Sequence, residues 1–238
     1  MKDLFFGDTP YQIFNILNIL MSSSRNEKPD LVFSHNFSGS HSLLERVKTT
    51  GFFERIYEID NDDKLFRFIP KKVNAWLPII ISKLYLKKVL NFKFDSYNTF
   101  YASNLDNNVA LAIYSVVDFK SFIVYEDGFG SYVINMLTDH MNKRRLRALK
   151  IFHFRKKYFY VDSVLLYKPD LCISEIESVN GLNKLDVMDD TKVLFDVFDF
   201  NKESCAYKKI FIIDTVDKQD ENRDVIDNSI NSLSSTSL

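Results

Sequence analysis

Short apolar runs alternate with amphipathic stretches along the first 175 residues, and this pattern predicts an α/β fold with a largely parallel sheet. Runs rich in β-branched and aromatic residues indicate strands over 4–6, 31–34, 55–59, 99–102, 122–125 and 169–174. Stretches with helical spacing lie between them, over 10–21, 40–48, 70–94, 105–117 and 132–149, with an interruption or kink at Pro78. The regular exchange of strand and helix is the basis of this prediction.

A helix start is expected directly after the first strand. Thr9 can cap the helix, Pro10 suits the first helical position, and Gln12 has the spacing that closes a capping box. The turn at Gly7 and Asp8 followed by a helix N-terminus forms a natural site for an anionic group, because the N–H groups of the first turn are free. An ordinary βα turn without a ligand is the alternative.

The strand over 122–125 ends in two adjacent carboxylates, Glu126 and Asp127, and is followed by Gly128 and Gly130. Ligands of open α/β sheets bind at the carboxyl ends of the strands, so this turn is the candidate active site. Neighbouring side chains of an extended strand point to opposite faces, which predicts one chemical and one structural carboxylate. The chemical one can act as a general base, and the glycines let the backbone approach a ligand closely. A charged strand-exit turn is the alternative.

The chain is expected to divide after this first unit. Residues 1–175 form the N-terminal domain, and 176–207 are mixed, acidic and typical of a connector. Residues 208–214 form a strand-like apolar run, so 208–227 are interpreted as the start of a second α/β domain. The stretch 228–238 is rich in Ser and Asn and is expected to be a disordered tail.

Charge changes this picture slightly. Residues 1–185 hold 25 Lys and Arg against 20 Asp and Glu, whereas 186–238 hold 6 against 12, which gives the net charge of −1. The basic residues gather in 71–93 and in 141–157, where solvated helix faces, an anionic lipid surface and phosphate groups of an acceptor are the alternatives. The excess is too small to indicate a nucleic-acid partner.

Several chemistries lack their sequence signals. Cys172 and Cys205 form neither metal-ligand spacing nor a disulfide framework, and the four histidines show no metal spacing, so no metal site is expected. Walker, dinucleotide-binding and nucleophile-elbow motifs do not occur. No signal peptide and no apolar run of spanning length is visible, which predicts a cytoplasmic protein.

Two stretches together carry a resemblance to a known family. The segment from Gly7 to Ile19, GDTPYQIFNILNI, resembles the opening segment of bacterial family 52 glycosyltransferases, the group that contains lipooligosaccharide sialyltransferases. The segment from Tyr125 to Gly128 is similar to the acidic-acidic-glycine motif of these and related bacterial sialyltransferases. The resemblance covers roughly residues 1–215. Substrate binding is expected within the two stretches and the glycine that follows, at Gly7, Asp8, Thr9, Pro10, Tyr11, Gln12, Gly128 and Gly130.

The resemblance implies a GT-B arrangement, in which two Rossmann-like domains enclose the reaction. Family members typically transfer sialic acid from CMP-sialic acid with inversion, without a metal and without a cofactor other than the donor. The resemblance also implies that the acidic motif supplies the general base, with Asp127 as the preferred match and Glu126 as the alternative. The expected acceptor is a glycan of lipooligosaccharide, capsule or O-antigen assembly, lipid-linked forms included. The enzyme is expected in the cytoplasm, where peripheral contact with the inner face of the membrane and a homodimer are both left open.

One element of the family pattern is missing. Family members carry a His-Pro motif that holds the CMP phosphate, yet the four histidines here are followed by Asn36, Ser42, Met141 and Phe154. The expectation is therefore a shortened member, with an N-terminal Rossmann-like domain and an incomplete second one. Two other function classes stay open: a non-catalytic remnant that binds a glycan acceptor or a partner chain, and a peripheral membrane module that uses the two basic segments.

Overall fold

A parallel β-sheet organises the part of the chain that the structure, a computed structural model, describes. The described residues are 1–23, 25–59, 77–105, 107–128, 130–133, 151, 161–172, 181–187 and 191–199. They all fall within one unit, Met1–Lys202. The expected second domain, 208–227, and the expected tail, 228–238, lie outside the described residues.

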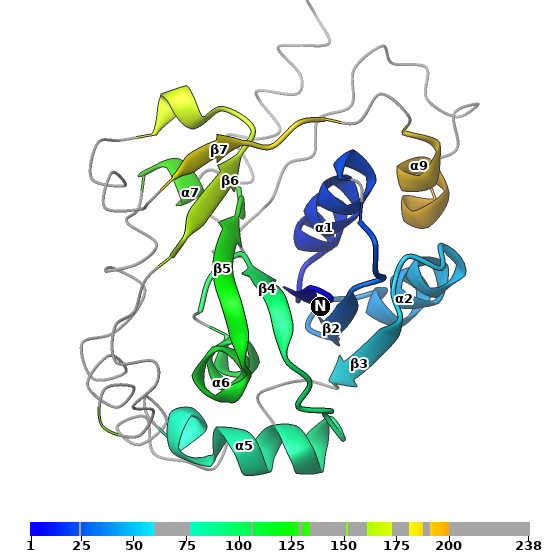
Figure 1. Ribbon diagram of the computed structural model, residues 1–238. Coiled ribbons are helices and arrows are strands. Elements are labelled where there is room, and N and C mark those ends of the chain that lie inside the picture. Colours follow the sequence, from blue (N-terminus) through cyan, green and yellow to red (C-terminus); the bar gives the residue numbers. More distant parts are fainter. Residues whose placement is uncertain are drawn as a thin grey trace, which may run out of the picture. The chain divides into compact units, whose positions relative to one another are not determined.

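Seven strands form the sheet in the order β3-β2-β1-β4-β5-β6-β7, and every pair is parallel (Figure 1). The chain builds outwards from β1 to one side and then returns to build the other side from β4, so the strand order reverses between β1 and β4. In open α/β sheets this reversal opens a crevice at the carboxyl ends of the strands. The strands are β1 Leu4–Gly7, β2 Asp30–Ser34, β3 Arg55–Ile59, β4 Tyr97–Ala102, β5 Phe119–Tyr125, β6 Ser163–Leu166 and β7 Leu182–Lys184.

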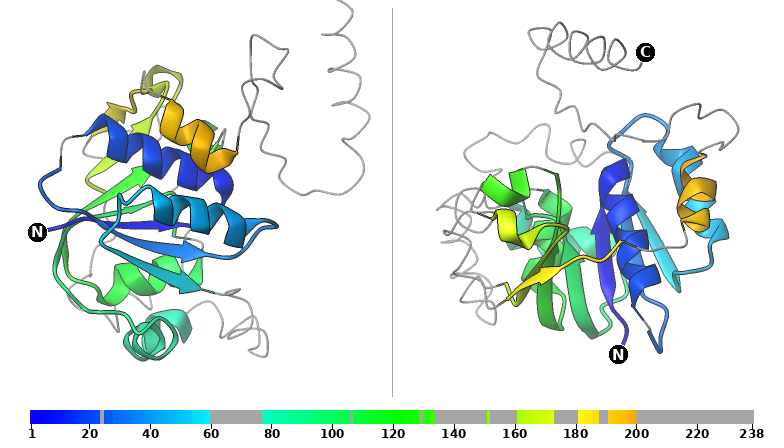
Figure 2. Two further views of the ribbon diagram at one scale, coloured as in Figure 1. Left: turned by 90° about the vertical axis from the view of Figure 1, so that its right-hand side faces the viewer. Right: turned by 90° about the horizontal axis from the view of Figure 1, so that it is seen from above.

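Helices cover both faces of the sheet, as the left view of Figure 2 shows. Alternate strand residues point to opposite faces, and so Phe5 and Phe33 pack in the core beneath α1, α2 and α9, whereas Phe6 and Val32 pack in the core beneath α5 and α6. This is a doubly wound α/β fold of Rossmann-like strand order. The helices are α1 Pro10–Ser22, α2 Ser40–Thr49, α5 Leu77–Val89, α6 Asn108–Val116, α7 Gly130–Val133, the 3-10 helix η2 Pro169–Leu171 and α9 Lys192–Phe198.

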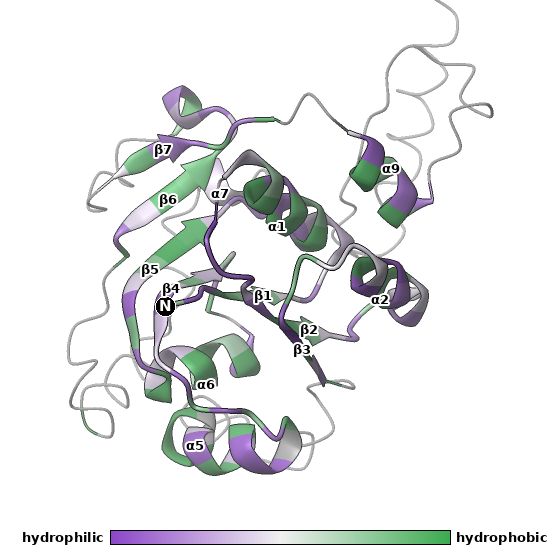
Figure 3. Ribbon diagram, turned by 45° about the vertical axis from the view of Figure 1, so that its right-hand side comes forward, coloured by the Kyte–Doolittle hydropathy of each residue, from purple (hydrophilic) through white to green (hydrophobic). Residues whose placement is uncertain are grey.

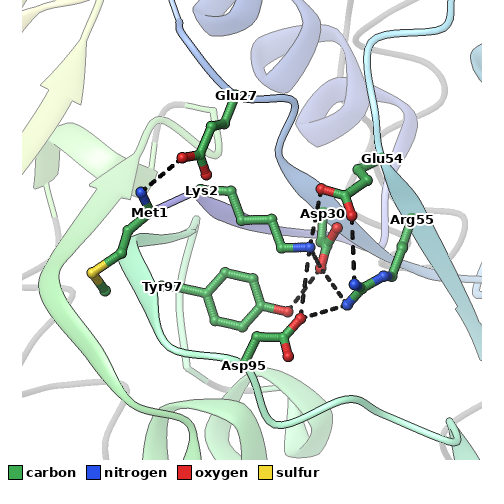
Figure 4. A network of polar contacts seen from close by, with 8 residues as sticks. All are labelled: Met1, Lys2, Glu27, Asp30, Glu54, Arg55, Asp95 and Tyr97. Carbon is green, nitrogen blue, oxygen red and sulfur yellow. Dashed lines mark hydrogen bonds and ion pairs between the residues drawn. The ribbon is translucent and has the colours of Figure 1, made fainter.

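A buried ionic cluster lies at the amino edge of the sheet (Figure 4). Asp30 is fully buried, and its Oδ2 lies 3.0 Å from Lys2 Nζ and accepts a hydrogen bond from the Tyr97 hydroxyl at 2.8 Å. Arg55 pairs with Asp95 at 2.5 Å and approaches the same Asp30 oxygen at 3.8 Å. Burial alone would lower the pKa of Lys2, but the hydrogen bond and charge of Asp30 raise it. Lys2 therefore stays charged and balances the buried carboxylate.

The cluster joins the starts of four neighbouring strands. Asp30, Arg55 and Tyr97 are the first residues of β2, β3 and β4, and Lys2 stands just before β1. Asp30 is also in register with Leu4 and with Arg55. Because a slip of one residue sends every side chain of a strand to the other face, this cluster is specific to the observed register.

Two predicted segments differ from the structure. The strand expected over 169–174 is wrong for 169–172, its described part: β6 lies earlier, at Ser163–Leu166, and Pro169 opens the 3-10 helix η2. Proline has no N–H for a sheet ladder but fits the first position of a helical turn, which explains the difference. The segment 176–207, expected as a connector, contains β7 and α9, and α9 packs in one core with α1 and α2 through Leu194 and Val197.

The other predicted elements agree within a few residues. The long basic helix expected over 70–94 is described from Leu77, as α5, with Pro78 in its first turn, and it ends at Val89, five residues earlier than expected. Of the helix expected over 132–149, the described part is the end of α7, and 134–149 lie outside the described residues. Within the described ranges, no helix is both long and apolar enough to cross a membrane.

Gly7 allows α1 to pack closely on β1, which generates the first prediction. A Cβ atom at this position would lie 2.7 Å from Ile13 Cδ1 and 3.0 Å from Ile16 Cδ1. Because this is overpacking of a buried contact, we expect Gly7→Ala to lower the free energy of unfolding by about 1–3 kcal/mol, measured by urea denaturation.

Ile13→Val is the matched control, because it removes the Cδ1 atom that the new methyl group would meet. Alone it should lower the free energy of unfolding by about 0.5–1.5 kcal/mol. The double variant should lose less than the sum of the two single variants. If the losses of the two single variants add up in full in the double variant, contact with Ile13 is not what restricts position 7 to glycine.

Candidate functional site

The carboxyl ends of β1, β4 and β5 meet at one edge of the sheet, beside the point where the strand order reverses. β1 delivers Asp8, the loop after β4 delivers Asn104 and Asn107, and β5 delivers Glu126 and Asp127. Helix α1 begins at this edge. Residues that are more than 100 positions apart in the sequence thus meet here, as the hydrogen bonds from α1 to the turn after β5 show.

Glu126 is a buried carboxylate whose two oxygens both accept hydrogen bonds. Its side chain is 6% exposed. The Tyr11 hydroxyl donates to Oε1 at 2.7 Å, and the Tyr132 hydroxyl and the Tyr167 backbone N–H, at 3.0 Å, donate to Oε2. A buried charge is stable only when it is well hydrogen-bonded, and Glu126 meets this condition. It therefore ties α1, α7 and the end of β6 to β5.

The tyrosines around Glu126 stay protonated at neutral pH. Burial, and then the hydrogen bond to Glu126, raise the pKa of Tyr11 and of Tyr132 well above the ordinary phenol value. Burial and the charge of Glu126 likewise raise the pKa of Tyr167. Both phenols that face Glu126 are thus permanent donors to the carboxylate. Glu126 fits a structural role better than a chemical one.

Asp127 lies differently, partly exposed and surrounded by amide groups. Gln12 Nε2 lies 3.1 Å from both Oδ1 and Oδ2, and Asn104 Nδ2 donates to Oδ2 at 2.9 Å. The Asp127 N–H donates to the buried Ser131 Oγ at 2.7 Å, which fixes the backbone at the start of α7. The carboxylate is therefore held in one orientation while its surface stays in reach of a ligand.

Asp8 is the second carboxyl group of this crevice. Asn107 Nδ2 donates to Asp8 Oδ2 at 2.8 Å, and the Asp8 N–H donates to Gln12 Oε1 at 3.0 Å. The amide of Gln12 thus bridges the Asp8 backbone and the Asp127 side chain. Burial, and then the negative charge of Asp127, raise the pKa of Asp8 although hydrogen bonds from Asn107, Gln12 and Asn36 oppose the shift.

A row of buried amides continues along α1. Asn15 Nδ2 donates to the Glu126 carbonyl oxygen at 2.9 Å, and Asn15 Oδ1 accepts from the Tyr167 hydroxyl at 2.6 Å. One turn further, Asn18 Nδ2 donates to the Asp186 carbonyl oxygen at 2.7 Å. Residues three apart share a helix face, so Gln12, Asn15 and Asn18 form a polar stripe that fastens α1 across the ends of β5, β6 and β7.

The N-terminus of α1 is a poor site for an anionic group. Thr9 caps the helix as expected, because its Oγ1 accepts the Gln12 N–H at 3.1 Å. Pro10 has no N–H to offer, and the Gln12 side chain turns to Asp8 and Asp127 and not back to Thr9. With these carboxylates so near, the geometry favours an ordinary βα turn over the anion site.

The glycines expected at the ligand have backbone roles. Gly128 has a φ of +82°, a conformation that favours glycine, and its carbonyl oxygen accepts the Ser131 N–H. Gly130 is the first residue of α7, and Gly7 is required by the packing of α1. All ten residues predicted for the site thus lie at the carboxyl ends of β1 and β5 or in the first turns of the helices that follow them.

Sequence reasoning missed the other half of the crevice. Asn104 and Asn107 follow β4, and Tyr132 and Tyr167 follow the next strands. A signal existed for Asn107, which caps α6 by accepting the Val109 N–H at 2.7 Å and precedes an apolar helical run. The tyrosines had no such signal, because their partner is an acid far away in the sequence.

Comparison with known proteins adds no assignment: no protein-family model matches the chain, and no curated protein shows significant similarity to it. Among the residues with a described position, no group of three or more His, Cys, Asp and Glu side chains could hold a metal ion. The carboxyl edge of the sheet presents an oriented, partly exposed carboxylate, Asp127, beside amide donors and a second carboxyl group. Such a group can accept a proton from a hydroxyl of a ligand.

The contrast between the two carboxylates predicts different effects on stability. Glu126→Gln replaces one carboxylate oxygen by an NH₂ group and leaves the partly buried Tyr132 hydroxyl or the Tyr167 N–H without its acceptor. We expect the free energy of unfolding to fall by about 1–3 kcal/mol. Asp127→Asn, at a partly exposed site where water can replace a lost partner, should change the free energy of unfolding by less than about 1 kcal/mol. Urea denaturation of both variants tests this, and equal losses would contradict the division of roles.

The raised pKa of Asp8 predicts a pH-dependent stability. An acid whose pKa is higher in the folded state favours folding when it is protonated, and this contribution is lost as the pH rises from the ordinary value of 3.8 through the raised folded value. Asp8→Asn should therefore raise the free energy of unfolding at neutral pH, and the gain should disappear below pH 3.8. The control is Asp170→Asn, at an exposed position. A variant that is less stable than the unchanged chain at neutral pH would contradict the argument.

Proposed function

We propose that the chain is a glycosyltransferase of the sialyltransferase type that acts in surface polysaccharide or lipooligosaccharide assembly in the cytoplasm. One observation carries the proposal. The two stretches that resemble the family lie in direct contact, because Tyr11 donates to Glu126 and Gln12 donates to Asp127. Two sequence segments that fit one family separately also form one crevice, at the edge of the sheet where α/β enzymes bind their ligands.

In the proposed reaction Asp127 acts as the general base. It accepts the proton of an acceptor hydroxyl, the hydroxyl oxygen forms a bond to the anomeric carbon of the donor sugar, and the bond from that carbon to the nucleotide phosphate breaks. CMP leaves with the bonding electrons, and the anomeric configuration inverts. Gln12 and Asn104 hold the carboxylate in place. Glu126 positions the turn and takes no part in proton transfer, since it is buried beneath its three donors, whereas Asp127 is partly exposed.

The described unit supplies the acceptor side of this reaction. The carboxylates around the N-terminus of α1 are unfavourable for donor phosphates, which agrees with a donor bound elsewhere. In a GT-B arrangement a second Rossmann-like domain holds the nucleotide, and CMP-sialic acid is the donor that we propose. The acceptor is a glycan, and its hydroxyl groups suit the amides and carboxylates of the crevice as hydrogen-bonding partners.

A second candidate function follows from one sequence observation. No histidine of the chain is followed by proline, so the group that holds the CMP phosphate in the family has no counterpart here. A unit with an intact acceptor crevice and no donor site would bind a glycan or a partner chain without catalysing transfer.

Asp127→Asn tests the proposed base. Because general base catalysis typically contributes about 10²- to 10⁴-fold, turnover with CMP-sialic acid and lipooligosaccharide-derived glycans should fall by that factor. The fold and the affinity for CMP should not change, since Asp127 lies on the acceptor side. Asp170→Asn, at an exposed carboxylate, is the control and should keep full activity. Unchanged turnover in Asp127→Asn would remove this residue from the mechanism.

Calorimetric titration of the unchanged chain with CMP, and with UDP and GDP as controls, separates the two candidate functions. Saturable binding of CMP alone supports the sialyltransferase. Preference for UDP would assign another class of sugar donor. If none of the three nucleotides binds, the non-catalytic binding function replaces the enzyme.

A further inference from the structure

The outer face of α5 combines exposed aliphatic side chains with lysines. Ile80 and Leu84 are 39% and 56% exposed, and Lys83, Lys87 and Lys88 are exposed beside them. The positions 80, 83, 84 and 87 follow the spacing of a single helix face. We call these five residues the α5 outer face. Figure 3 shows that α5 carries hydrophobic and hydrophilic residues along its length, in green and purple.

The inner face of α5 already has its partner. Ile79, Ser82, Tyr85 and Leu86 are buried, and the apolar ones among them belong to the core that α6 also forms. In Figure 1 α6 lies between α5 and β5, so α5 is the outer helix of this layer. Burial in the core therefore explains one side of the helix and leaves Ile80 and Leu84 without an explanation.

The charge of the α5 outer face has one sign. The helix LPIIISKLYLKKV contains three lysines and no Asp or Glu. In the part of the chain that the structure covers, none of Lys83, Lys87 and Lys88 forms an ion pair or hydrogen bond with another side chain. Just beyond the helix, exposed Lys93 and Phe94, which is 37% exposed, extend the same combination of cation and apolar group.

We propose that the α5 outer face binds an anionic lipid surface, with Ile80 and Leu84 in the headgroup boundary and the lysines at the phosphates. Helices that lie on membranes combine an apolar contact with lysines in this way. A protein partner fits less well, because the centres of protein interfaces are depleted of lysine and enriched in aromatic residues and arginine. The inference does not depend on the proposed enzyme activity.

The contact has a defined strength and salt dependence. Each lysine near an anionic surface strengthens binding about fivefold, and this attraction decays within the Debye length, about 10 Å at 0.1 M salt. Three lysines therefore contribute about a hundredfold, and two partly inserted aliphatic side chains add to it. We expect reversible, salt-sensitive binding, which is typical of a peripheral membrane protein that exchanges between the membrane surface and solution.

Vesicle sedimentation of the full chain tests the proposal. The chain should bind vesicles of phosphatidylcholine with phosphatidylglycerol, should not bind phosphatidylcholine alone, and should be released by high salt. The triple variant Lys83→Gln, Lys87→Gln, Lys88→Gln should weaken binding about a hundredfold. Leu84→Ser, which keeps the charge, should weaken it several-fold.

The matched control removes three exposed lysines from other elements, by Lys28→Gln, Lys120→Gln and Lys184→Gln, and should bind nearly as well as the unchanged chain. Equal weakening in this control would mean that only net charge matters, and unchanged binding of the α5 triple variant would move the contact to another segment such as 141–157. Both results overturn the proposal. Absence of vesicle binding also overturns it, and a concentration-dependent dimer that Leu84→Ser abolishes would then assign this face to a second copy of the chain.

Discussion

The buried charge of Glu126 is the constraint on which the candidate site depends. A carboxylate with 6% exposure needs donors, and the chain brings them from α1, from α7 and from the backbone after β6. Satisfying this one group places the N-terminus of α1 against the turn after β5. The neighbouring residue, Asp127, then meets Gln12 as a consequence. Chemistry and architecture are thus divided between two adjacent acids.

This division explains why the motif around Thr9 to Asn18 has so many polar residues in a largely apolar helix. Thr9 caps the helix, Tyr11 and Gln12 bind the two acids, and Asn15 and Asn18 bind the carbonyl groups of later segments. Apart from the Thr9 cap, none of these groups is required for an isolated helix. Their spacing is instead set by the ends of β5, β6 and β7, so the helix sequence carries information about strands far along the chain.

The sequence was sufficient for the elements whose pattern is local. The strands from β1 to β5 and helices α1, α2 and α6 follow from apolar runs, caps and turn residues, and the acidic turn was placed at the correct edge. The sequence does not predict the strand β7, because Leu182, Asn183 and Lys184 form an exposed edge strand with no apolar pattern. The sequence also does not predict the roles of Tyr132 and Tyr167, because hydrogen bonds to the distant Glu126 leave no local sequence pattern.

The ionic cluster at the amino edge has a mechanical consequence for the opposite edge. Strands are stiff and rise about 3.3 Å per residue, so a shift in their alignment at one end appears undiminished at the other. Lys2, Asp30, Arg55 and Tyr97 align the starts of β1 to β4. They thereby set the position along the strand axis at which Asp8, after β1, and Asn104, after β4, lie beside Asp127. A substitution in the ionic cluster can therefore alter the geometry of the site at the opposite ends of the same strands.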